Sequence, residues 1–174
     1  MAVFGAAIVA GCSGGGETGG GTDAPTAGGD PASETPTAGG AGAESASTPP
    51  SDADPRALLP EPPEGWEQGE LVEQTADSLE SVGAEAGYGA FYTDADGGEY
   101  FVEILRWPSA GDAESAWEET YSDSPSWVVY VTRNNFSFAA NGPDADGVED
   151  QVVTLVGNSP ALTDGYVDGN NRVG

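Results

Sequence analysis

Between Ser13 and Pro55 the chain contains no leucine, valine, isoleucine or aromatic residue. The segment consists of Gly, Ala, Ser, Thr and Pro with scattered acids, so it cannot bury enough apolar surface to offset the entropy of ordering its backbone. We therefore predict a disordered tether over residues 12–57. A folded domain must then come from residues 58–174, where tryptophan, tyrosine and the aliphatic residues are concentrated.

The domain has the pattern of an α+β fold. Alternating apolar residues predict strands at 68–75, 86–93, 99–107, 127–133 and 136–140, and two hairpin turns are predicted, at 94–98 and at 134–135. The strand at 99–107 is apolar on both faces, which indicates a central position in the sheet. Helical spacing predicts helices at 112–121 and 148–156, with Gly157 just past the second one and a turn opened by Ser159. We expect an antiparallel sheet of about five strands with two helices packed on it.

The charge of the chain is strongly one-sided, with 30 acidic and 4 basic residues and a formal net charge of −26. Nucleic acid binding requires cations against phosphates, so we expect no nucleic acid partner. Self-repulsion of this size is relieved by concentrated salt. In its acidic excess and its lack of lysine, the chain resembles proteins of halophilic archaea.

The missing residue types also restrict catalysis. Without histidine there is no Ser-His-Asp or Cys-His pair, and without lysine there is no Schiff base or P-loop lysine. The single cysteine permits no intrachain disulfide. We expect no enzyme activity and no cofactor.

Residues 2–10 form a short apolar run that suits a signal-peptide core and is too short to span a bilayer. Val9, Ala10, Gly11 and Cys12 follow, and this arrangement resembles the lipobox of haloarchaeal lipoproteins. The resemblance implies that residues 1–11 are a signal peptide, that Cys12 is lipidated, and that the protein is anchored at the outer face of the cell membrane. Because no basic residue precedes the apolar run, we expect the signal to begin upstream of Met1. The alternative is a buried strand with an inert core cysteine.

Several other residues are candidate sites, each with a structural alternative. Asp94 and Asp96, and likewise Asp144 and Asp146, could ligate calcium, although each stretch lacks the third acid of an EF-hand loop and Asp-Gly also favours turns. Arg106 and Arg133 could bind an anion or form structural ion pairs. Asn135 begins an N-glycosylation sequon.

Carboxylate pairs and aromatic residues supply the remaining candidates. Glu99 with Glu103, or Glu118 with Glu119, could serve glycoside hydrolysis, but any such pair is expected by chance in so acidic a chain. An aromatic platform for a sugar or another flat ligand could be formed by Tyr100, Trp107, Trp117, Trp127 and Tyr130, which also fit core positions.

The function predicted from the sequence is binding or scaffolding at the cell surface, with a cell-surface protein or glycan as partner. The alternatives are a carboxylate-based hydrolase of envelope glycans and an accessory subunit of a transporter or envelope complex. An exposed apolar patch or sheet edge would favour a protein partner, and a cleft with two convergent carboxylates would favour the hydrolase.

Overall fold

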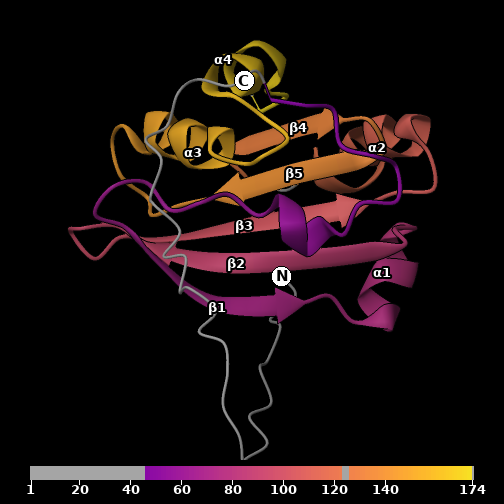
Figure 1. The fold of residues 1–174 in the computed structure, drawn as a ribbon, viewed down its shortest axis with the longest axis horizontal. Helices are drawn as coiled ribbons and strands as arrows, with labels where there is room; N and C mark the ends of the chain where they lie inside the picture. Colours follow the sequence, from indigo (N-terminus) through magenta and orange to yellow (C-terminus); the bar gives the residue numbers. More distant parts are fainter. Residues whose placement is uncertain (1–45, 123–125, 174) are drawn as a thin grey trace, which may run out of the picture. The chain divides into compact units, whose positions relative to one another are not determined.

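A computed structural model describes residues 46–122 and 126–173. It contains five strands, β1 (Glu67–Glu73), β2 (Ala86–Thr93), β3 (Glu99–Arg106), β4 (Val129–Arg133) and β5 (Phe136–Asn141). These strands form an antiparallel sheet of order β1-β2-β3-β5-β4, with helices packed on it (Figure 1). The α+β class and the central position of β3 are confirmed.

The two predicted hairpins are present, and both depend on backbone with positive φ. Gly97 has φ of 85° in the turn between β2 and β3, and Asn134 has φ of 55° in the turn between β4 and β5. Glycine and asparagine are the residues that adopt this conformation at the lowest cost. The turn chemistry that the sequence displays therefore sets the strand register on either side.

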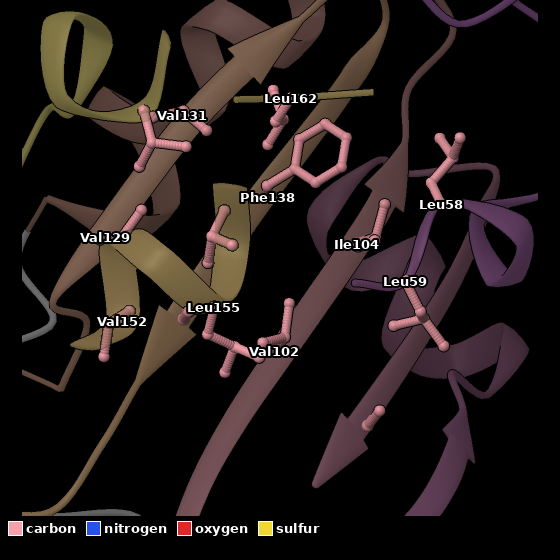
Figure 2. Packing of buried hydrophobic residues seen from close by; sticks show 14 of the residues in the cluster. Leu58, Leu59, Val102, Ile104, Val129, Val131, Phe138, Val152, Leu155 and Leu162 are labelled. Carbon is pink, nitrogen blue, oxygen red and sulfur yellow. The ribbon is translucent and has the colours of Figure 1, made fainter. Parts of the chain in front are cut away.

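One face of the sheet, here called the first face, carries the larger core. Val102 and Ile104 of β3 are fully buried there under Val152 and Leu155 of the helix α3 (Val148–Gly157). Figure 2 shows Leu58 and Leu59 in the same cluster, beside Ile104. The helix α3 thus buries Val152, Leu155 and Val156, and Val148 at its start is partly buried.

The second face of the sheet is covered at one end. The helix α2 (Ala110–Ala116) continues into a π-helical turn, η2 (Trp117–Tyr121), and packs there with Leu105 and Tyr130. The predicted helix at 112–121 is thus present but begins earlier, because the Ser109 side chain accepts a hydrogen bond from the backbone N–H of Asp112 and caps the helix.

The structure also differs from the prediction of two helices. The helices α1 (Ala76–Val82) and α4 (Asp164–Asn170) are additional, and each is only seven residues long. Each starts at a threonine that caps the first turn, but neither carries a long apolar stripe that would have revealed it in the sequence. None of the helices in the described ranges is long and apolar enough to cross a membrane.

The predicted role of Gly157 was wrong. The helix α3 ends through Asn158, which has ordinary helical φ, and Gly157 is its last residue. A Cβ atom at position 157 would collide with the side chain of Asp164, so glycine is needed there for the close approach of α4. The turn at Ser159 is present, since the backbone N–H of Leu162 donates to its carbonyl at 3.0 Å.

The folded part of the chain begins before Leu58, within the region predicted to be tether. Residues 46–59, here called the strap, contact the sheet and include the 3-10 helix η1 (Pro55–Leu58). The turn between β4 and β5 holds the strap, because Arg133, Asn134 and Asn135 donate hydrogen bonds to the carbonyls of Ala46, Pro49 and Ser51 at 2.9, 3.0 and 2.9 Å. Polar side chains distant in sequence hold residues 46–51, which contain no leucine, valine, isoleucine or aromatic residue, whereas Leu58 and Leu59 bury the other end of the strap in the core.

Candidate functional site

The two candidate arginines are engaged within the domain. Arg106 lies 3.5 Å from the Glu85 carboxylate and donates to the Ala53 carbonyl at 3.4 Å. The Arg133 guanidinium lies 4.7 Å from the centroid of the Tyr166 ring, in addition to its bond to the strap. Arg106 is therefore used in an ion pair, and Arg133 in a cation–π contact.

Asn135 is unsuited to carry a glycan in the folded protein. Its side chain is 5% exposed, and its Nδ2 atom donates to the carbonyls of Ser51 and Trp107, each at 2.9 Å. Glycosylation would modify this same nitrogen. The strap thus covers the turn on which the sequon lies.

The calcium candidates serve as turn residues. The Asp94 carboxylate accepts hydrogen bonds from the backbone N–H groups of Asp96 and Gly98, at 2.9 and 2.7 Å, and from the Tyr100 hydroxyl at 2.9 Å. These bonds, that of Gly98 foremost, lower the pKa of Asp94. Asp144 and Asp146 are exposed before Gly147, which has φ of 80° at the start of α3. Over residues 46–122 and 126–173, no group of three or more acidic or cysteine side chains could hold a metal ion.

The nominated carboxylate pairs do not have the geometry of a glycosidase. Glu99 and Glu103 stand four residues apart on β3, which corresponds to about 13 Å along a strand. Glycosidase carboxylates are separated by roughly 5–9.5 Å. Glu118 and Glu119 are adjacent on η2 and both are exposed.

Core packing accounts for the aromatic residues proposed as a platform. Tyr100, Trp107 and Tyr130 are almost fully buried, and Trp117 and Trp127 pack against the core of the second face. The aromatic residue that is exposed was not among them: Phe91 of β2 is 42% exposed. The sequence could have indicated the position of Phe91 through the alternation of side chains in β2. Tyr88, Ala90 and Tyr92 occupy the first face, which leaves Phe91 on the second.

Phe91 lies at the uncovered end of the second face. Its ring centroid is 4.9 Å from that of Phe101, its direct neighbour on β3. Phe101 lies over Gly89, where an added Cβ atom would come within 2.5 Å of the ring. Gly69 of β1 borders the pair on the other side, since a Cβ atom added at Gly69 would lie 3.7 Å from the Phe91 Cβ atom. We call this surface of Phe91, Phe101, Gly69, Gly89 and Val72 the Phe91 face. It is an apolar patch in which two glycines, Gly69 and Gly89, lie beside the two phenyl rings.

A half-buried carboxylate marks the border between the Phe91 face and the covered end. Glu103 accepts hydrogen bonds from the Gln74 side chain at 2.8 Å and from the Tyr121 hydroxyl at 3.4 Å. Burial raises the pKa of Glu103, and burial together with the Glu103 charge raises the pKa of Tyr121. The site thus combines two phenyl rings with a carboxylate, an amide and a phenol that can accept or donate hydrogen bonds.

The lipobox residues Val9, Ala10, Gly11 and Cys12 lie outside the described residues. No protein-family model matches the chain, and comparison with curated proteins and with solved structures gives no match.

Proposed function

We propose that the chain is a binding protein of the cell surface, anchored through a lipid on Cys12, whose domain recognises a partner through the Phe91 face. The observation that carries the proposal is the Phe91–Phe101 pair, of which Phe91 is exposed, at the end of the second face that α2 and η2 leave uncovered. Aromatic residues in an exposed apolar patch are typical of interaction sites.

The Phe91 face lies at the end of the sheet opposite the first described residues of the strap. The strap begins at Ala46, beside Arg133 at the turn that ends β4. Arg106 and Arg133 both pair with Phe136, so they lie at the same end of the sheet. Phe101 stands five residues before Arg106 on β3, which places it about 17 Å away along the strand. The chain thus enters the domain at one end of the sheet, and the Phe91 face lies at the other end.

The acidic composition is consistent with a protein of a halophilic archaeon, because dissolved salt would screen the excess charge. Tethering to a membrane would raise the effective concentration of the domain for partners at the same surface. A transporter or envelope complex is one setting for such a partner.

Mass spectrometry of protein extracted from membranes tests the anchor. We expect an intact mass that lacks residues 1–11 and carries a lipid on Cys12. A Cys12→Ser variant should stay unlipidated and leave the membrane fraction. A wild-type chain with an unmodified Cys12 still joined to residues 1–11 would contradict the anchor and would leave the binding face untested by this measurement alone.

A binding assay with isolated cell envelopes tests the Phe91 face. The soluble Cys12→Ser chain should bind the envelopes in concentrated NaCl, and adding Phe91→Ala should weaken binding about tenfold or more, the loss expected for an aromatic anchor. Glu118→Gln, a change at an exposed residue on η2, serves as the control. Equal binding of the Phe91→Ala variant would exclude this surface as the recognition site.

The hydrolase is the second candidate, and Glu103 is the observation in its favour. A half-buried carboxylate with a raised pKa is suited to donate a proton. A Glu103→Gln variant that binds envelopes normally but no longer releases sugars from them would support this alternative over binding alone.

A further inference from the structure

We propose that the outer edge of β1 and the adjoining Phe91 face dock an extended, cationic segment of a partner protein, which adds a strand to the sheet. The inference rests on the proposed binding function and specifies the chemistry of the partner. It follows from the hydrogen bonding of the two sheet edges, from the charge around β1, and from the position of Gly69.

The edge at β4 is closed by the chain itself. The Tyr130 carbonyl accepts a hydrogen bond from the backbone N–H of Arg172 at 3.0 Å, and the Tyr130 N–H donates to the Asn171 side chain at 3.0 Å. Further along, the Tyr166 hydroxyl donates to the Thr132 carbonyl at 2.7 Å. A partner strand therefore finds the outward N–H and C=O of Tyr130 and the outward C=O of Thr132 already occupied.

The edge at β1 presents open backbone groups. The N–H of Gln74 donates to the Gly87 carbonyl at 3.0 Å, which makes Gln74 and Gly87 a hydrogen-bonded pair. Because such pairs alternate with non-bonded pairs along antiparallel strands, the N–H and C=O groups of Leu71 and Glu73 point outward. No hydrogen bond from the described residues reaches these groups. Their pairing capacity is available to another strand.

Charge selects among the possible occupants of this edge. Glu67, Glu70 and Glu73 are all exposed along β1. A second copy of the chain would bring the same glutamates against them, and like charges on facing strands are destabilising. Residues 13–45 of this chain contain acids but no lysine or arginine, so they offer no complement. A cationic strand is the occupant that the edge attracts.

The glycine at position 69 connects the edge to the aromatic pair. Gly69 has no side chain to cover Phe91, although a Cβ atom added at position 69 would be in van der Waals contact with Phe91. An arginine side chain from a docked strand can reach across Gly69 and stack on the Phe91 ring, since a guanidinium within about 6 Å of a ring centroid is attracted to it. Glu99 and Glu103, the neighbours of Phe101 on its own face, supply carboxylates beside this position.

Amide hydrogen exchange tests the docking directly. The soluble Cys12→Ser chain is mixed with a synthetic peptide in which arginine and valine alternate, at the lowest NaCl concentration at which the chain stays folded, because concentrated salt would screen the charges that select the peptide. We expect exchange of the Leu71 and Glu73 amides to slow about tenfold or more, because they gain acceptors, while the Val72 amide, already in a bonded pair, is unchanged. A peptide in which glutamate replaces arginine should give no protection.

Three variants make the test specific. Leu71→Pro removes an outward N–H from an edge strand without breaking a bond to β2, and Gly69→Val covers the path to Phe91 with ordinary contacts to it. Each should reduce peptide affinity about tenfold, which is about 1.4 kcal/mol. Glu67→Gln should weaken binding, whereas its exposed control Glu118→Gln should not.

Two results of the exchange and sedimentation experiments would overturn the inference, and a third would come from envelope binding. One is absence of protection by the arginine peptide; the other is concentration-dependent dimerisation in sedimentation experiments that protects the same two amides, which would identify a second copy as the occupant. If envelope binding requires Phe91 but is unaffected by Leu71→Pro, edge docking is wrong while the proposed binding function holds.

Discussion

Asn135 shows how one side chain can join parts of the domain that are distant in the sequence. Its Nδ2 atom bridges the carbonyls of Ser51 in the strap and Trp107 after β3, and the Asn135 carbonyl accepts from the Trp107 N–H at 2.8 Å. Its neighbour Asn134 also holds the strap, but it is exposed and has positive φ. We therefore expect the two asparagines to contribute different amounts to the free energy of unfolding.

We predict that Asn135→Ala lowers the free energy of unfolding by about 1–3 kcal/mol, because the buried Trp107 carbonyl and the partly buried Ser51 carbonyl lose their donor. Asn134→Gly keeps the positive φ and loses one partly buried bond made by an exposed residue, so its cost should stay below about 1 kcal/mol. Urea denaturation of both variants checks the difference. Equal costs for the two variants would show that burial of the turn is not what makes Asn135 important.

Glu103 should make stability depend on pH in an identifiable direction. Because burial raises its pKa in the folded protein, the folded state binds the proton more tightly than the unfolded state. The stability that this group contributes is present at low pH. It is lost as pH rises from the pKa that Glu103 has in the unfolded state through the higher pKa that it has in the folded state. Glu103→Gln should accordingly stabilise the protein near pH 7, and its advantage should vanish in acid, below the ordinary glutamate pKa of about 4.3. Urea denaturation across this pH range provides the measurement, and a constant difference between variant and wild type would count against it.

At the level of helices and strands, backbone conformation decides what each glycine does. Gly147 precedes α3 with φ of 80°, whereas Gly165 lies within α4 with no positive φ. An added Cβ atom meets no atom within 4 Å at either position. A comparison of alanine substitutions at Gly147 and Gly165 therefore measures the effect of backbone conformation without a difference in packing.

We predict opposite effects for alanine at these two positions. Gly147→Ala should destabilise the protein by about 1–2 kcal/mol, the cost of left-handed backbone for a residue with a Cβ atom. Gly165→Ala should stabilise it by about 0.4–1 kcal/mol, because alanine restricts the unfolded chain and favours the helix. Thermal unfolding of both variants provides the comparison, and a shift of the same sign in both would refute the argument.

For the whole molecule, electrostatic repulsion opposes the compact state. The formal net charge is −26, and the four cations are arginines, two of which are already engaged with Glu85 and Tyr166. Exposed carboxylates of the same sign repel one another until salt shortens the screening length. Folding and salt concentration are therefore coupled in this chain.

We predict that the urea midpoint of unfolding rises with NaCl and levels off above roughly 1 M, where the Debye length falls to about 3 Å. Sucrose, which favours the compact state without screening charge, serves as the control and should give no such plateau. Tryptophan fluorescence follows the transition. A midpoint that does not change with NaCl would mean that repulsion among the carboxylates does not limit stability.

The sequence by itself determined the strands of the sheet, its two hairpins and the central position of β3. These features depend on alternation within a strand and on residues that accept positive φ, both of which are local properties. The sequence also excluded catalysis by histidine or lysine, because those residues are absent.

Only the tertiary structure decided which surfaces are covered. The burial of Asn135 depends on the strap, which the composition of residues 46–57 predicted to be tether. Phe91 is exposed because α2 and η2 pack over the other end of its face. The C-terminal contacts close β4 and leave β1 open. Such outcomes depend on contacts between segments far apart in the chain, and the spacing of residues within one segment does not encode them.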